Sequence, residues 1–157
     1  MRTRNFLKLF VFFALVLGGG FYNKAFAAVD CSDTVTTGVP VLECQALMAL
    51  YNSTNGTSWT TKTNWNTASA VSTWYGVTVL SGHIKTLSIA SNNIVGTLPT
   101  ELGNLGPSIT NLTLSGNRGI TGQIPSSVGN LTSLTTLGLY TNALSGNIPT
   151  ELGNLVN

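Results

Sequence analysis

The sequence predicts an α/β-type solenoid, a coil of stacked repeats with short parallel strands on its concave side. The pattern L-x-x-L-x-L-x-x-N begins at Ile84, Ile109 and Leu134, so it recurs twice at a step of 25 residues. Behind each copy a glycine and a proline recur in register, in IVGTLPTELGNL, ITGQIPSSVGNL and LSGNIPTELGNL. Alternating apolar positions in the front half indicate a strand with one buried face. A single coil buries its leucines only against neighbouring coils, so the copies must stack.

An asparagine follows each predicted strand at the point where the chain must turn: Asn92, Asn117 and Asn142. A buried amide can pair backbone groups that neither the strand nor the turn satisfies. We therefore expect the three asparagines to stack as a ladder with a structural role. A glycine after each asparagine allows backbone conformations that other residues rarely adopt. The proline that comes next ends regular hydrogen bonding before a short convex segment such as ELGNL.

The start of the chain has the character of a secretory leader. Basic residues precede and enter an apolar run from Phe6 to Leu17, and Ala25-Phe26-Ala27 offers small residues for cleavage. A membrane anchor is the alternative, although the run is shorter than the roughly 20 apolar residues that span a bilayer. The predicted parts are a signal peptide over 1–27, an N-terminal cap over 28–83, and repeats over 84–108, 109–133 and 134–157.

The predicted cap begins with a helix over about 40–51, PVLECQALMALY, in which Pro40 suits a first-turn position. Trp59, Trp65 and Trp74 follow and are expected to shield the open edge of the first repeat, with sugar stacking as the alternative role. We expect no matching cap after the third repeat, whose open edge favours association with another molecule or with a second copy. A truncated fragment is the other interpretation of that edge.

Cys31 and Cys44 are the two cysteines of the chain, and both follow the predicted leader. An exported protein meets an oxidising compartment, so we expect a disulfide between them. Closing this loop would stabilise the fold by roughly 2 to 3 kcal/mol. Two free buried thiols are the alternative.

Charge and residue types argue against several classes of function. Without the leader, three basic residues face five acidic ones, a net charge of −2, and no basic run is present to bind nucleic acid. His83 has no local catalytic partner and is expected to be a solvated turn residue. Glu101 and Glu151 occupy equivalent repeat positions, so repetition explains them. Metal-ligand spacings and phosphate loops are missing, so we expect no enzyme, metal or cofactor.

The repeats and the segment WYGVTVLSGHIKTLSIASNNIVGTLPTELGNL resemble plant-type leucine-rich-repeat proteins and the bacterial secreted proteins that share this repeat class. The resemblance runs from about Glu43 to the end of the sequence. Ser72 and Val79 stand where the plant cap usually has cysteines, which makes the bacterial form the closer match. The resemblance implies a right-handed solenoid that recognises protein or glycan ligands on its concave sheet.

The outward positions of the predicted strands form a small, polar and nearly uncharged face on which Tyr140 is the side chain of hot-spot type. A solvated scaffold face is the alternative interpretation. The candidate binding residues are Thr86, Ser88, Ala90, Asn111, Thr113, Ser115, Thr136, Gly138 and Tyr140.

We expect an exported, non-catalytic interaction or adhesion module, secreted or at the cell surface of a bacterium, with no membrane span in the mature chain. The alternatives are an inhibitor of extracellular cell-wall hydrolases and an ice- or carbohydrate-binding protein. Four N-x-S/T triplets begin at Asn52, Asn55, Asn111 and Asn130, and we interpret them as by-products of an Asn- and Thr-rich composition.

Overall fold

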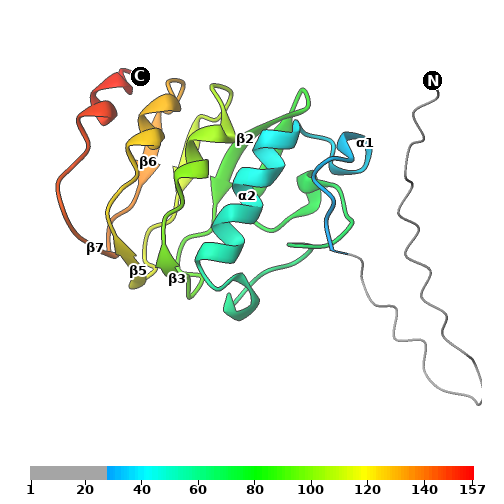
Figure 1. Cartoon of the computed structure of the whole chain (residues 1–157), viewed down its shortest axis with the longest axis horizontal. Coiled ribbons are helices and arrows are strands. Elements are labelled where there is room, and N and C mark those ends of the chain that lie inside the picture. The colour runs from blue at the N-terminus through cyan, green and yellow to red at the C-terminus, as the bar shows by residue number, and fades with distance from the viewer. Residues whose placement is uncertain (1–27) are drawn as a thin grey trace, which may run out of the picture.

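The computed structural model describes residues 28–157, so the expected signal peptide over 1–27 lies outside the described residues. Figure 1 shows a solenoid in which successive coils lie side by side, with helix α2 at the end nearer the N-terminus. The solenoid of stacked repeats with parallel strands, predicted from the sequence, is confirmed.

Two helices open the described chain: α1, Thr34–Thr37, and α2, Val41–Ser53. The Asp33 side chain caps α1 by accepting the N–H of Thr36. Helix α2 begins directly after Pro40 and ends two residues later than the expected Tyr51, because the N–H and the hydroxyl of Thr54 both donate to the Leu50 carbonyl. This helix lies against the first coil and closes that end of the core.

The expected disulfide is present between Cys31 and Cys44, whose Cα atoms are 5.5 Å apart. It joins the segment before α1 to the buried side of α2, where Cys44 is fully buried. The loose start of the cap is thereby tied to the element that covers the first repeat.

An aromatic cluster fills the space behind α2, and it consists of Tyr51, Trp59, Trp65 and Trp74. All three tryptophans are at most 3% exposed. Each indole N–H still donates to a backbone carbonyl, as buried tryptophans normally require. Short 3-10 helices η1, Gly56–Ser58, and η2, Val71–Thr73, position these rings. The rings act as core, and none offers a face for sugar stacking.

The first sheet contains strands β1, Val77–Leu80; β2, His83–Ser88; β4, Asn111–Thr113; and β6, Thr136–Gly138, in that order. Strands β2, β4 and β6 are parallel, as the repeats predict. Strand β1 was not predicted. It pairs antiparallel with β2 through the turn at Ser81-Gly82, where both residues have positive φ. The hairpin extends the sheet into the cap.

A second sheet, which we did not predict, lies beyond the asparagine turns. It contains β3, Val95–Thr97; β5, Gly119–Gly122; and β7, Ala143–Leu144, all parallel. A proline then precedes each 3-10 segment of the remaining side: η3, Thr100–Leu105; η4, Ser126–Asn130; and η5, Thr150–Asn154. The short convex segments expected from ELGNL and SVGNL are therefore 3-10 helices.

The apolar repeat positions form the core, and their burial falls toward the third coil. Leu98 is 6% exposed, whereas its repeat equivalent Ile148 is 77% exposed, because a following coil covers the first and none of the described residues covers the second. No helix within residues 28–157 has the length and apolar character needed to cross a membrane.

The three turn asparagines bond from coil to coil. Asn117 Oδ1 accepts the N–H groups of Asn92 and Ile94 at 2.7 and 3.2 Å, and its Nδ2 donates to the carbonyls of Ile89 and Leu114. Asn142 Oδ1 accepts the Asn117 N–H at 2.9 Å in the same way. Asn92 Oδ1 accepts the N–H of Thr61, which carries the pattern into the cap. Each of these amides therefore pairs backbone groups of a neighbouring segment at the turn that follows a strand.

Candidate binding face

One row of polar side chains crosses the first sheet at right angles to its strands. The register pairs Thr86 with Asn111 and Asn111 with Thr136, and β1 extends the row because Thr78 pairs with Thr86. Paired strands lie about 4.8 Å apart, so neighbours in the row are within reach of one ligand. Within β4 the Thr113 hydroxyl donates to Asn111 Oδ1 at 2.7 Å, which fixes the orientation of that amide.

A second row follows two residues later, where Ser88 pairs with Thr113 and Thr113 with Gly138. Gly138 is buried, and a Cβ built on it would lie 3.1 Å from Thr113 Cγ2. A larger residue at position 138 would therefore push against Thr113. Because Gly138 has no side chain, the second row offers no polar group on β6, in contrast to Ser88 on β2 and Thr113 on β4.

The nine candidate residues differ in how much surface they offer. Ser115 is only 4% exposed, whereas Tyr140, the side chain of hot-spot type, is 72% exposed. Ser115 and Gly138 thus present little surface to a ligand. The remaining seven residues, which we call the binding face, are Thr86, Ser88, Ala90, Asn111, Thr113, Thr136 and Tyr140.

The chemistry of the binding face is that of hydrogen bonding. It offers hydroxyls, one amide and one phenol, and none of its members carries a charge at neutral pH. At its margin the hydroxyls of Thr110 and Thr135 donate to the carbonyls of Lys85 and Thr110. Such a surface suits polar contacts around one exposed aromatic ring.

His83 differs from the expectation of a solvated turn residue. It begins β2, its side chain is 48% exposed, and its Nδ1 lies 2.6 Å from Oε1 of the buried Glu43. The other oxygen of Glu43 accepts the Ile84 N–H at 2.7 Å. This pair had no signal in the sequence, because its members are 40 residues apart and meet only in the folded chain. The carboxylate fastens the cap to the first coil.

No group of three or more His, Cys, Asp or Glu side chains that could hold a metal ion occurs in residues 28–157. Glu101 and Glu151 lie in the equivalent segments η3 and η5, as repetition predicts. Each carboxylate accepts only the hydroxyl of the preceding threonine among its side-chain partners in this part of the chain.

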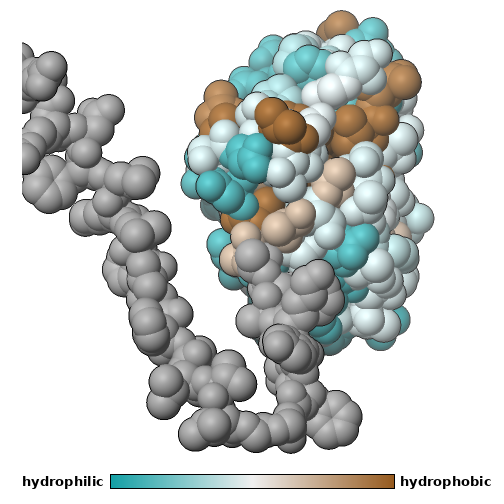
Figure 2. Space-filling view, turned by 90° about the vertical axis from the view of Figure 1, so that its right-hand side faces the viewer, coloured by the Kyte–Doolittle hydropathy of each residue, from teal (hydrophilic) through white to brown (hydrophobic). Residues whose placement is uncertain are grey.

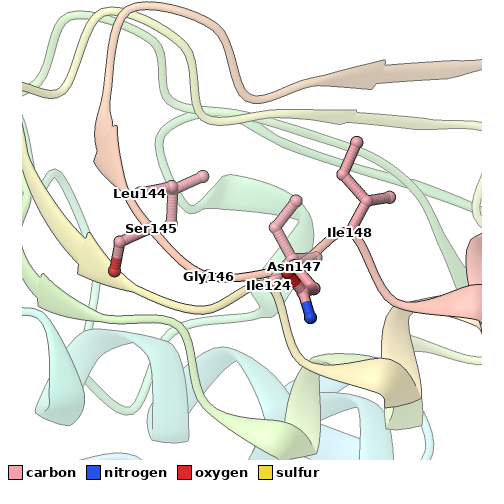
Figure 3. A pocket seen from close by; sticks show the side chains of 6 residues that line it. All are labelled: Ile124, Leu144, Ser145, Gly146, Asn147 and Ile148. Carbon is pink, nitrogen blue, oxygen red and sulfur yellow. The ribbon is translucent and has the colours of Figure 1, made fainter.

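A hollow lies away from the binding face, beside strands β5 and β7. It is lined by Ile124, Leu144, Ser145, Gly146, Asn147 and Ile148 (Figure 3). The close-up shows that most of these residues belong to the third coil, with Ile124 contributed by the second. The hollow follows from the incomplete covering of the third coil described above, and Ser145 and Asn147 are the polar residues of its lining.

The opposite end of the solenoid carries exposed apolar side chains from three elements: Val35 of α1, Leu42 of α2 and Leu80 of β1. Figure 2, which views this end, shows separate brown patches divided by white and teal surface. Scattered apolar residues are normal on a protein surface, whereas a continuous patch would indicate an interface. The binding face thus remains the better candidate.

A family model described as Leucine Rich Repeat matches residues 83–105, 108–131 and 133–155, one match for each copy of the pattern. The chain carries three leucine-rich repeats. The stacked parallel strands and the asparagines between coils are the structural expression of that repeat, so the resemblance inferred from the sequence is confirmed.

Among curated proteins, the chain is similar to the receptor kinase-like protein Xa21 of Oryza sativa subsp. japonica. The two are 43% identical over 56 residues, which is 36% of this chain and 5% of the rice protein. The similarity therefore concerns a small part of that receptor and says nothing about the rest of it.

Among solved structures, the BIR2 ectodomain from Arabidopsis thaliana gives a TM-score of 0.64 at 25% identity, covering 72% of this chain and 62% of the ectodomain. The GASSHO1/SCHENGEN3 ectodomain from the same plant, in complex with CASPARIAN STRIP INTEGRITY FACTOR 2, gives 0.61 at 30% identity, covering 74% and 14%. The leucine-rich repeats thus resemble those of receptor ectodomains. All three relatives come from plants, and none supports the bacterial origin expected from the leader.

Proposed function

We propose that this protein is an exported, non-catalytic adhesion or interaction module that recognises a protein partner through the binding face. The observation that carries the proposal is the in-register row of Thr86, Asn111 and Thr136, together with exposed Tyr140 four residues after Thr136. A rigid sheet holds these groups, so a ligand would not have to order them on binding.

The relatives support protein recognition as the class of function. The GASSHO1/SCHENGEN3 ectodomain, which is 30% identical to this chain over 74% of its length, was solved in complex with CASPARIAN STRIP INTEGRITY FACTOR 2. Because the binding face carries no charge, we expect its affinity to depend weakly on salt, unlike an interface formed by charged surfaces. A ligand would gain most by packing an apolar group against Tyr140 and bonding to the hydroxyl rows.

In the test, the full chain is cross-linked to its partners in a mixture of extracellular proteins, and the captured partners are identified and purified. Their dissociation constants from the full chain are then measured. Thr113→Arg and Tyr140→Glu place bulky charges on the binding face and should weaken binding at least about tenfold, a change of about 1.4 kcal/mol. Thr121→Arg, on the exposed side of β5 in the second sheet, is the matched control and should bind as the wild type does. Equal binding by all three variants would reject the binding face.

Carbohydrate binding is a second candidate, favoured by the row of hydroxyls and the amide of Asn111. Hydroxyl rows of this kind match the many hydroxyls of a sugar chain, and an exposed tyrosine ring can pack against a pyranose face. A glycan array probed with the wild type and with Tyr140→Ala separates the candidates. Glycans that bind the wild type but not Tyr140→Ala would favour a carbohydrate ligand over a protein ligand.

A further inference from the structure

The four N-x-S/T triplets differ sharply in their surroundings. In the triplet that begins at Asn52, the Thr54 hydroxyl is buried and donates to the Leu50 carbonyl. Asn111 is half-buried in β4 and bonds to Thr113 within the binding face. Both triplets are therefore accounted for by the fold.

The triplet Asn55-Gly56-Thr57 stands apart. Asn55 and Thr57 are exposed in the turn after α2, and the Thr57 hydroxyl donates to Asn55 Oδ1 at 3.2 Å. Asn55 Nδ2 makes no hydrogen bond within residues 28–157, so the nitrogen that a glycan would occupy faces solvent. The Oδ1 of this amide is held by the very hydroxyl that the triplet requires.

Packing fixes the middle residue of this triplet as glycine. A Cβ built on Gly56 would overlap the ring of Tyr51, so any side chain there would disturb the aromatic cluster. Asn55 itself adopts φ +52°, a left-handed conformation that asparagine tolerates better than most residues. The fold thus explains Asn55 and Gly56, but it gives the exposed Thr57 no partner other than Asn55.

We propose that Asn55 is an N-glycosylation site, an inference that rests on the proposed export of the chain. The donor would be an oligosaccharide linked through pyrophosphate to a polyisoprenyl lipid. A bond forms between Asn55 Nδ2 and the first sugar carbon, the sugar–pyrophosphate bond breaks, the lipid pyrophosphate leaves, and the amide loses one proton.

A glycan at Asn55 would leave the binding face open. The preceding residue, Thr54, accepts the N–H of Val95, which places this turn beside β3 of the second sheet. The glycan would extend from that flank, whereas the proposed ligand approaches the first sheet. Modification and binding are therefore compatible in one molecule.

Asn130 begins the other exposed triplet, at the end of η4. Asparagine recurs at the equivalent repeat positions Asn104 and Asn154, where no triplet forms, so repetition accounts for Asn130. Peptide mapping must therefore measure Asn55 and Asn130 separately.

The test secretes the full chain from a eukaryotic host under that host's own leader, so that export does not depend on residues 1–27. Peptide mass spectrometry before and after peptide-N-glycosidase treatment should show Asn55 converted to aspartate. Thr57→Ala should lose at least about nine-tenths of the glycan at Asn55, Thr57→Ser should keep it in part, and the exposed control Thr60→Ala should keep it fully.

Unmodified Asn55 in secreted, folded wild type would overturn the proposal, as would an unchanged glycan in Thr57→Ala. Thermal melting of each secreted variant shows whether it is folded, so a folding defect is not mistaken for lost modification. The outcome is independent of the binding measurements, because Thr57 lies outside the binding face.

Discussion

The N–H of Asn92 donates to Oδ1 of Asn117 at 2.7 Å, so one coil is bonded to the next by a buried side-chain amide. Removing that amide also leaves the Ile94 N–H and the Ile89 carbonyl without their partners, whereas the Leu114 carbonyl keeps its bond from Asn142 Nδ2. We therefore predict that Asn117→Ala lowers the free energy of unfolding by about 1 to 3 kcal/mol, measured by urea denaturation.

Asn142→Ala is the matched control for this prediction. Asn142 makes the same kind of bonds to Asn117, Leu114 and Leu139, but it is half-buried and water can replace the lost partners. Its effect should be smaller than that of Asn117→Ala. Equal effects at the two positions would contradict the role given to burial, and a neutral Asn117→Ala would undo the ladder as a stabilising feature.

The buried carboxylate of Glu43 supports a second prediction. Glu43→Ala leaves the Ile84 N–H without its partner and removes the contact to His83 between the cap and the first coil. We predict a loss of about 1.5 to 3 kcal/mol, as for hydrogen bonds to charged groups, by chemical denaturation. His83→Ala should cost less, because its side chain is 48% exposed and Glu43 keeps the Ile84 bond. A larger cost for His83→Ala would refute this assignment.

The start of the cap should depend on pH. Hydrogen bonds from the Thr36 hydroxyl and N–H lower the pKa of the Asp33 carboxyl below 3.8, and those from Ser32 lower the pKa of Asp30 in the same way. A carboxyl whose pKa is lower in the folded state than in the unfolded state stabilises the folded protein when the pH is above the ordinary, unfolded-state pKa. This contribution is lost as pH falls through the folded-state pKa.

We therefore predict that the amides of α1 lose protection from hydrogen exchange as pH is lowered below 3.8, after correction for intrinsic exchange rates. Asp33→Ala should lack most of this pH dependence and show low protection throughout. The effect on global melting should be small, because both carboxyls are exposed and the disulfide to Cys44 retains the segment. Protection that rises on acidification would have the wrong sign.

The repeats could be predicted because their signals are local and repeated. Alternation of leucines around Leu87, Leu112 and Leu137 defines one strand per coil, and the fixed step sets their register. The cap helix was predicted within two residues because Pro40 marks its start and Cys44, Leu47, Leu50 and Tyr51, which are all buried, recur at helical spacing. The disulfide followed from two cysteines and the expected compartment.

The remaining features depend on contacts between distant segments. The strands of the second sheet have only two to four residues, too few for an apolar alternation to appear. The pair Glu43 and His83 forms only when the cap docks. Outward placement of the candidate residues follows from strand alternation, but the burial of Ser115 depends on the residues around it in the folded chain. Whether the binding face takes a ligand stays a prediction.

Glycines of the convex segments offer a final test of how closely the coils stack. A Cβ on Gly103 of η3 would lie 2.5 Å from the Ser127 carbonyl oxygen, and one on Gly129 of η4 would overlap the Glu151 carbonyl. Gly153 of η5 occupies the equivalent position, yet a Cβ there meets nothing within 4 Å. Backbone atoms cannot rotate aside as a side chain would, so the first two sites resist enlargement by a single methyl.

We predict that Gly103→Ala and Gly129→Ala each destabilise the protein by about 1 to 3 kcal/mol in urea denaturation, the usual cost of overpacking. Gly153→Ala should be neutral or stabilising by up to about 1 kcal/mol, because alanine restricts the unfolded chain without a clash in the folded one. The three substitutions are chemically identical and lie at equivalent repeat positions, so the difference between them reports the neighbouring coil alone. If Gly153→Ala were as costly as Gly129→Ala, local helix geometry rather than coil packing would explain these glycines.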